Sequence, residues 1–356
     1  MQKLLITAAI IACVTLSAAA SAHELDYQIY GVAHVSTDLQ NNGADSSLFV
    51  SSNNTRFGIR GTYATDYELF TVVFQHENSA DFNGERSGLS TRNSFAGLQG
   101  DWGRLIWGRH DTPFYSLGRT ADLFGDCLGD ARSVTGYFGY GWDLRMHSML
   151  MYSTPQLADA LKLHVQHVAE EGREDRMFLS ASGVYQQGAV TIGLAYELHG
   201  KGWETAYSDS LYLADVGEAQ DSGAFRAIAV YNAGGLKVAG LFQSISDVAG
   251  YDGASATTFG LGASYRLDSG VEPKAQVYVT DPNTDVDDDG ATMVGVGLDY
   301  HLTKKSRLYM AYATMLNEDD AKFVPFRGGH GKNYGYGAAV SGESPYGISV
   351  GLIAGW

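Results

Sequence analysis

Apolar and polar residues alternate along most of this chain, and the alternation constrains its fold more than any other feature of the sequence. Successive side chains of an extended strand point to opposite faces, so alternation indicates a strand that is apolar on one face only. In the segment 67–77, Phe70, Val72 and Phe74 share one face, and the segment 348–356 repeats the pattern. The sequence therefore predicts an all-β fold.

Sixteen segments of this kind can be placed along the chain. They are centred near Ile29, Gly58, Val72, Ala96, Ile106, Leu150, Val165, Ala181, Leu194, Ala229, Gly240, Leu261, Val277, Gly297, Met310 and Val350. A soluble β protein turns its apolar faces inward, but side chains cannot fill a barrel of sixteen strands, which encloses an aqueous channel. Polar side chains such as Arg56, Gln75 and His164 then face water inside, and apolar ones face lipid. We therefore expect a 16-stranded antiparallel transmembrane β-barrel.

The first 22 residues have the composition of an export signal. Lys3 gives a positive start, the segment 4–16 is almost continuously apolar, and Ala20 and Ala22 form a small-x-small cleavage site. We expect cleavage of the signal peptide 1–22 before His23, which leaves residues 23–356 as one barrel domain. Because no later stretch approaches about 18 consecutive apolar residues, we expect no transmembrane helix.

Charge and cysteine content exclude other classes of protein. The formal net charge is −16, whereas a nucleic-acid-binding protein needs a basic surface. Of the two cysteines, Cys13 falls within the expected signal, so Cys127 has no internal partner for a disulfide after cleavage. We therefore expect neither nucleic acid as a partner nor a disulfide or cysteine-based zinc scaffold.

One connection, residues 111–143, is exceptionally long for a barrel of short strands. Connections of this length are usually functional or disordered. This one carries the aromatic residues Phe114, Tyr115, Phe124, Tyr137, Phe138, Tyr140 and Trp142. So many aromatic side chains indicate a packed loop rather than a disordered one.

Several short segments resemble the trimeric general porins of Gram-negative outer membranes. The segment 55–61 (TRFGIRG) is similar to the second-strand motif of that family, and 74–77 (FQHE) is similar to the end of its third strand. The segments 91–98 (TRNSFAGL) and 145–155 (RMHSMLMYSTP) are similar to strands on either side of the family's long loop. The terminal aromatic residue, Trp356, resembles the membrane-insertion signal that the barrel-insertion machinery reads.

The resemblance implies that residues 111–143 form a constriction loop, which folds into the lumen of the barrel and narrows it. In the family, acidic residues on this loop face a cluster of arginines on the barrel wall. The corresponding residues here are Arg56, Arg60, Arg92, Arg109 and Arg145 on the wall and Asp122 and Asp126 on the loop, with Arg119 and Arg132 as further loop candidates. Opposed charges across a narrow constriction produce a transverse field, in which water and hydrophilic solutes reorient while apolar solutes are slowed.

The expected function is therefore that of an outer-membrane porin, a water-filled channel for passive diffusion of ions and small hydrophilic solutes, without catalysis or a cofactor. The resemblance implies a homotrimer in the outer membrane of a Gram-negative bacterium, in contact with lipid and lipopolysaccharide. The acidic net charge predicts a mild cation preference at low salt, which the wall arginines oppose.

Two alternative functions remain open. A substrate-specific channel on the same barrel would bind an oligosaccharide or another nutrient, and Trp142 is the aromatic residue to watch because it lies beside the constriction loop. An outer-membrane barrel enzyme, a lipase or a protease, is the other alternative, although the sequence places no convincing set of nucleophile, base and orienting group.

A possible cation site lies near the C-terminal third of the chain. Asp285, Asp287 and Asp289 match the first half of a calcium-binding loop. Position twelve of that loop is Val296 instead of the Glu that an EF-hand requires, so a full EF-hand is excluded. A looser calcium or magnesium site and a simple acidic external loop both remain possible.

Overall fold

The computed structural model describes residues 24–84, 88–136, 142–169, 177–201, 220–248, 253–283, 288–326, 330 and 338–356. Among these residues, no helix is long and apolar enough to cross a membrane. The expected signal, 1–22, and its cleavage site before His23 lie outside the described residues, as do Asp285 and Asp287.

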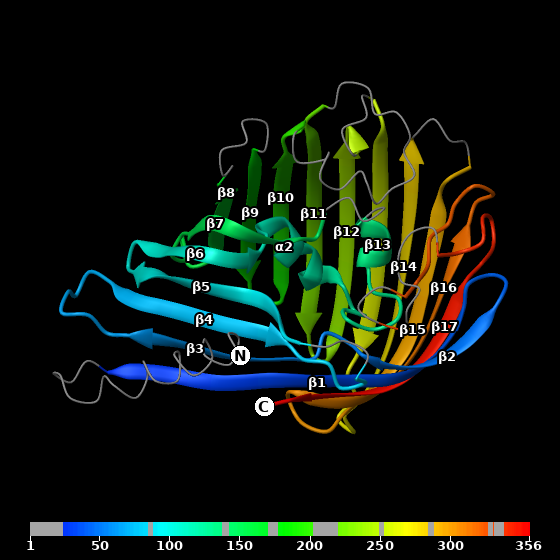
Figure 1. The fold of residues 1–356 in the computed structure, drawn as a ribbon, viewed down its shortest axis with the longest axis horizontal. Coiled ribbons are helices and arrows are strands. Elements are labelled where there is room, and N and C mark those ends of the chain that lie inside the picture. Colours follow the sequence, from blue (N-terminus) through cyan, green and yellow to red (C-terminus); the bar gives the residue numbers. More distant parts are fainter. Residues whose placement is uncertain are drawn as a thin grey trace.

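Within the described residues, seventeen strands form one antiparallel sheet (Figure 1). They are β1 (Leu25–Asn41), β2 (Ser46–Ser52), β3 (Arg56–Tyr63), β4 (Thr71–Ser79), β5 (Ser90–Gly100), β6 (Gly103–Asp111), β7 (Arg145–Ser153), β8 (Leu161–Val168), β9 (Phe178–Gln187), β10 (Val190–His199), β11 (Ser222–Ala233), β12 (Leu236–Ser246), β13 (Ser255–Tyr265), β14 (Val271–Asn283), β15 (Ala291–His301), β16 (Ser306–Asn317) and β17 (Tyr346–Gly355). Each expected centre falls inside one of these strands.

The sheet closes on itself through β1. One edge of β1 pairs with β17, from Val32 opposite Gly355 to Asn41 opposite Tyr346. The other edge pairs with β3 near its start and with β2 near its end. Closure pairs the strands on both edges, which is how a sheet can span a bilayer without unsatisfied backbone groups.

Strands β2 and β3 occupy a single position in the barrel, because both lie along the same edge of β1. Residues 53–55 interrupt them: Asn54 has a positive φ of 51°, a conformation that Asn tolerates better than most residues. The side chain of Asn53 donates to the Ser36 hydroxyl at 2.7 Å, and Thr55 bonds the backbone of His34. Seventeen strands therefore give sixteen barrel positions, and the expected 16-stranded antiparallel barrel is confirmed.

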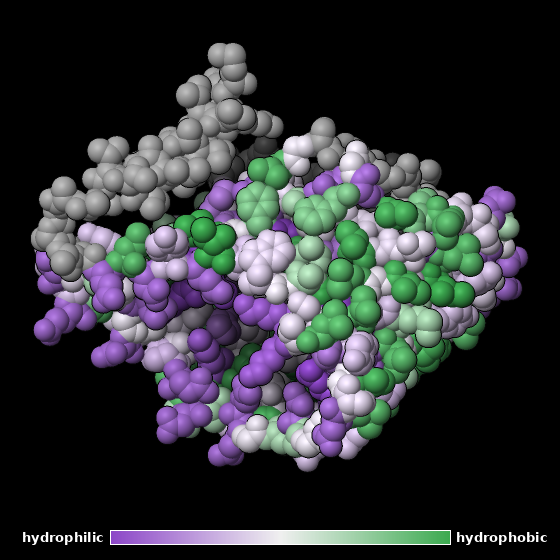
Figure 2. Space-filling view, turned by 90° about the horizontal axis from the view of Figure 1, so that it is seen from below, coloured by the Kyte–Doolittle hydropathy of each residue, from purple (hydrophilic) through white to green (hydrophobic). Residues whose placement is uncertain are grey.

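Apolar side chains cover the outside of the barrel and polar side chains point inward. On the outside, Leu194 of β10 and Leu261 of β13 are 52% and 59% exposed. On the inside, Arg226 of β11 and Gln243 of β12 are fully buried beneath the long loop. In Figure 2 hydrophobic side chains cover one flank of the molecule and hydrophilic ones gather around a hollow beside it. This is the pattern of a barrel with lipid outside and water inside.

The connection between β6 and β7, which contains the constriction loop, folds into the barrel. Its described residues, 112–136 and 142–144, include the helices α2 (Pro113–Ala121) and α3 (Arg132–Thr135). Helix α2 begins after Thr112, whose hydroxyl accepts a hydrogen bond from the backbone of Tyr115. Pro113 fits the first turn because its missing N–H would have no partner there.

Helix α2 lies against the inner faces of β9, β10 and β11 (Figure 1). Its buried side chains Phe114 and Leu117 belong to a core cluster with Ala195 of β10 and Ile228 of β11. Gly193 provides the space, since a Cβ there would lie 2.3 Å from the Leu117 Cδ1 atom. The aromatic loop is thus packed onto the wall, and it occupies the lumen beside β9–β11.

Candidate constriction site

The tip of the constriction loop, residues 122–132, places acidic residues around two arginines. The Asp126 carboxylate accepts hydrogen bonds from Arg119 Nη2 at 3.1 Å and from Arg132 Nη2 at 2.8 Å. Asp126 has a positive φ of 64°, and its backbone N–H turns toward the carboxylate of Asp130 at 2.7 Å. The turn thus brings two loop acids into contact with the same pair of arginines.

Asp130 is the residue that holds this tip together, although the family motifs do not indicate it. Its side chain is fully buried and accepts from Arg119 Nη1 at 3.2 Å and from Arg132 Nε at 2.8 Å. It also accepts from the backbone N–H of Arg132 at 2.9 Å. The spacing Asp-x-Arg is the sequence signal for this local turn, because an aspartate bonds readily to the backbone two residues on.

The surroundings of the three carboxyls separate their pKa values. For Asp126 and Asp130, burial acts to raise the pKa, but the charges of Arg119 and Arg132 outweigh it and hold the pKa of each below its usual range. Burial raises the pKa of Asp122 to about 7, and the nearby charge of Asp130 adds to the effect. Its carboxylate lies 3.6 Å from Arg119 Nη1, outside hydrogen-bonding distance. Asp122 is therefore the loop acid that titrates near neutral pH.

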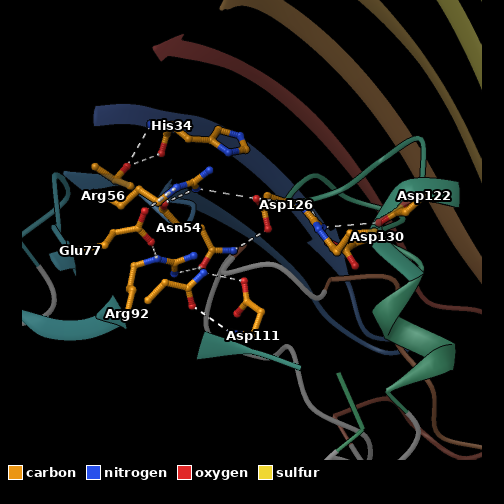
Figure 3. A network of polar contacts seen from close by, with 12 residues as sticks. His34, Asn54, Arg56, Glu77, Arg92, Asp111, Asp122, Asp126 and Asp130 are labelled. Carbon is orange, nitrogen blue, oxygen red and sulfur yellow. Dashed lines mark hydrogen bonds and ion pairs between the residues drawn. The ribbon is translucent and has the colours of Figure 1, made fainter. Parts of the chain in front are cut away.

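The barrel wall opposite the loop tip carries Arg56 and Arg92, which share Glu77 (Figure 3). Arg92 Nε donates to Glu77 Oε1 at 2.7 Å, and Arg56 Nε lies 3.9 Å from Glu77 Oε2. Asn54 links wall and loop: its Nδ2 donates to Asp126 Oδ1 at 2.8 Å. Arg56 Nη1 lies 4.0 Å from Asp126 Oδ2. The expected wall and loop charges therefore meet at this point.

Arg145, at the start of β7, lies in a neighbouring pair. Its Nη2 contacts Asp111 Oδ1 at 2.9 Å, and its Nε donates to Asn93 Oδ1 at 2.7 Å. Asn93 in turn donates to Asp111 at 3.0 Å. Asp111 ends β6 and Arg145 begins β7, so this pair sits where the constriction loop leaves and rejoins the wall.

Two of the expected arginines lie outside this network. Arg60 is exposed, donates to Gln28 Oε1 at 3.0 Å and lies over the ring of Tyr30. Arg109 has no ion pair among the described residues, and its buried Nε has no hydrogen-bond partner. The β6–β7 register shifts between Gly108 and His110, on either side of Arg109.

Polar side chains from distant parts of the chain hold the loop backbone. Lys274 Nζ donates to the carbonyl of Leu123 at 3.2 Å, and Gln276 Nε2 donates to that of Gly129 at 2.6 Å. His330 Nε2 lies 2.9 Å from the carbonyl of Asp126. Alternation indicates that Lys274 and Gln276 of β14 face inward, but it does not indicate which backbone groups they contact.

The remaining expected residues fall elsewhere. The side chain of Trp356 is 53% exposed, and its backbone N–H donates to the Gly31 carbonyl at 3.2 Å, where β17 meets β1. Asp289 is buried, while Asp285 and Asp287 lie outside the described residues. In the part of the chain that the structure describes, no group of three or more His, Cys, Asp or Glu side chains is placed to hold a metal ion.

Known proteins share this sequence pattern and this barrel. The chain is 24% identical over 342 residues to the outer membrane protein Omp-EA of Erwinia amylovora, covering 83% of this chain and 87% of that relative. It is 36% identical over 104 residues to a chitoporin of Vibrio furnissii, a match that covers 26% of this chain and 28% of that relative.

Two solved structures show the same fold. An anion-selective porin from Comamonas acidovorans superposes with a TM-score of 0.76 at 20% identity, covering 94% of this chain and 100% of that one. The trimer form of OmpT from Vibrio cholerae superposes with a TM-score of 0.67 at 15% identity, covering 93% of this chain and 99% of that one. The family model for Gram-negative porins matches residues 7–320, so the chain belongs to the Gram-negative porin family of the outer membrane.

Proposed function

We propose that this porin conducts ions and small hydrophilic solutes passively, and that its selectivity is set where the loop tip faces Arg56 and Arg92. The observation that carries the proposal is the contact between the in-folded loop and the wall, through Asn54 and Asp126. A charged constriction of this kind admits solutes that keep their hydration and slows apolar ones.

The charges nearest to the water of the constriction are guanidinium groups. The side chains of Arg56 and Arg119 are 26% and 29% exposed, whereas that of Asp126 is 16% exposed. The other two loop acids, Asp122 and Asp130, are almost completely covered. An ion that passes this point therefore comes closer to the arginine side chains than to the loop acids, so the constriction itself favours anions. The neighbouring fold from Comamonas acidovorans is named an anion-selective porin.

The acidic net charge of −16 opposes this local preference at long range. At about 0.1 M salt the Debye length is about 10 Å, so acidic external residues still attract cations to the mouth; at about 1 M it is about 3 Å, and only contacts within the constriction remain. We expect a mild cation preference at low salt that shifts toward anions at high salt.

Zero-current potentials of the reconstituted protein, measured across KCl gradients at both ionic strengths, test this proposal. Arg56→Ala should abolish the shift toward anions at high salt. Arg266→Ala, at an exposed arginine outside the network, is the matched control. The same cation preference at every salt concentration would contradict the proposal, and the absence of any conductance would contradict the channel itself.

A sugar-specific channel is the second candidate, favoured by the partial match to a chitoporin. Trp142, however, is 1% exposed and stacks on His199 with ring centroids 4.2 Å apart, so it is packed rather than available to a sugar. Saturable block of the current by chito-oligosaccharides, at concentrations that leave ion selectivity unchanged, would favour this candidate over general diffusion.

One buried cluster superficially resembles the hydrolase that the enzyme alternative requires. His330 Nδ1 lies 3.1 Å from Asp38 and 3.4 Å from the Ser36 hydroxyl. A catalytic histidine needs the acid and the nucleophile on different ring nitrogens. Here the other nitrogen faces the carbonyl of Asp126, and all three side chains are buried. This cluster therefore supports a structural role.

The expected partners and processing complete the proposal. The trimer form of OmpT, with the same fold, supports a homotrimer. Lipid and lipopolysaccharide would contact the apolar outer face, and the exposed Trp356 would serve as the membrane-insertion signal. Residues 1–22 would direct export and be removed, which mass spectrometry of the membrane-inserted protein would test by showing His23 at the N-terminus.

A further inference from the structure

A buried arginine of the barrel wall contacts both ends of the constriction loop. Arg226, on the inner face of β11, is 0% exposed. Its Nη1 pairs with Asp143 Oδ1 at 2.6 Å, at the end of the loop, and the Asp143 side chain is 2% exposed. The same Nη1 donates to the carbonyl of Phe114, at the start of α2, at 3.1 Å.

Helix α2 approaches this guanidinium closely at Phe114 and at Gly118. The Arg226 Cζ atom sits 3.9 Å from the centroid of the Phe114 ring, which gives a cation–π contact. A Cβ atom at Gly118 would lie 2.2 Å from Arg226 Nη1. Only glycine at position 118 lets the helix approach the arginine this closely.

A third part of the loop is held through a neighbouring strand. Arg226 Nε donates to Gln243 Oε1 at 2.9 Å, and Gln243 Nε2 donates to the carbonyl of Thr135 at 2.8 Å. The Thr135 hydroxyl donates to Asp143 Oδ2 at 2.8 Å. Arg226, Gln243, Thr135 and Asp143 thus form a closed ring of polar contacts, and all four side chains are buried.

We infer that Arg226 is the positioning residue of the constriction: by holding the start, the end and the second helix of the loop, it fixes how far the tip stands from Arg56. The inference rests on the proposed function of the loop as the constriction. Its contact with permeating solutes is indirect, because α2 and the loop end lie between Arg226 and the lumen.

The chemistry requires arginine rather than another cation. A planar guanidinium presents several N–H donors in fixed directions, so one side chain can serve a carbonyl, a carboxylate and an amide at once. Lysine offers one compact ammonium at the end of a flexible stem. Loss of the guanidinium would leave Asp143 buried without its cation, which is strongly unfavourable, so the loop end would move to reach water.

The test uses planar-bilayer recordings of the full-length porin and two substitutions at one site. Arg226→Gln should make closures of the open channel about tenfold or more frequent, because breaking a buried ion pair costs more than the factor of ten requires. Arg226→Lys keeps a cation for Asp143 but cannot also donate to Phe114 and Gln243, so it should make closures more frequent as well. Arg266→Gln removes an exposed arginine and should leave closures unchanged. Gly118→Ala keeps the arginine but displaces the helix from it, and should give the same closures.

A tether separates loop positioning from general loss of stability. Cysteines in place of Leu117 and Gly193, which meet across α2 and β10, would be oxidised to a disulfide in the Arg226→Gln background. Restored steady conductance on oxidation, reversed by reduction, is the expected result. The inference would be overturned if folded Arg226→Gln channels closed no more often than the wild type. It would also be overturned if oxidation of the tether left the frequency of closures unchanged. If the wild type itself fails to conduct, the proposed function has failed instead.

Discussion

Ionisation of Asp122 should make the ion selectivity of this porin depend on pH. Its carboxyl has a pKa of about 7, raised mainly by burial and also by Asp130. Below that pH, Asp126 and Asp130 balance the charges of Arg119 and Arg132. Above it, Asp122 adds a third negative charge to the loop tip, 3.6 Å from Arg119, the more exposed of the two loop arginines.

The size of the effect follows from Coulomb's law. Arg119 Nη1 lies 3.6 Å from the Asp122 carboxylate, so a monovalent ion about 4 Å from that nitrogen is within about 8 Å of the carboxylate. A unit charge at about 8 Å contributes about 0.5 to 2 kcal/mol for an effective dielectric constant between about 80 and 20. The local cation concentration should therefore rise by a factor of about 2 to 30 when Asp122 ionises, and the anion concentration should fall correspondingly.

Zero-current potentials at about 0.1 M KCl, where screening is modest, provide the assay. Between about pH 5 and about pH 9 the zero-current potential of the wild type should shift toward cation selectivity, with the midpoint of the shift near the carboxyl pKa. At both pH values, Asp122→Asn should have the ion selectivity that the wild type has at about pH 5. Asp126→Asn is the matched control, since the pKa of Asp126 is held far below this range. A wild-type selectivity that does not change with pH, or an Asp122→Asn channel whose selectivity still changes with pH, would show that Asp122 does not control the selectivity.

The same ionisation should affect stability. The Asp122 carboxyl titrates near 3.8 when unperturbed and near 7 in the folded chain. Between these values the folded chain binds more protons than the unfolded one, so stability falls as the pH rises through this window. The denaturation midpoint of the wild type should therefore decrease from about pH 4 to about pH 7, and Asp122→Asn should reduce that decrease.

Three further substitutions or probes test other parts of the structure. Arg92→Ala removes the 2.7 Å partner of Glu77 and should shift the zero-current potential toward cations, while Arg109→Ala, outside the network, should not. Phe124→Ala should lower the free energy of unfolding by about 3 to 5 kcal/mol, measured by denaturant titration, because the ring is fully buried. Cys127 should resist maleimide until the chain is unfolded, since the thiol is buried and burial raises its pKa to about 11; rapid labelling of the folded protein would contradict its placement.

The strands were predictable because each depends on a local pattern. Around Leu194 and Val350 the strand separates lipid from water, so alternate side chains face lipid and must be apolar. The division of one strand into β2 and β3 was not predictable, because it depends on the positive φ of Asn54 and on contacts with His34 across the sheet.

The candidate site was only partly predictable for a related reason. Family motifs point to Arg56 and Asp126, which the structure brings within 4.0 Å. They do not identify Asp130, whose pairing with the loop arginines depends on the turn at Asp126. Nor do they identify Arg226, since alternation predicts that it faces inward but cannot show that Phe114 and Asp143 converge on it.

The double pairing of β1 has a consequence for assembly of the protein. Val32 lies opposite Gly355, so the seam joins β1 to β17 and can form only after β17 is present. Contacts between such distant residues form slowly, because a long loop must close before they contribute free energy. Until then, β1 and β17 each expose a row of unpaired backbone groups that can pair with another chain. Aggregation during biogenesis is therefore a hazard at this seam, and a helper that covers the edge of β1 until β17 arrives would act at the most vulnerable step.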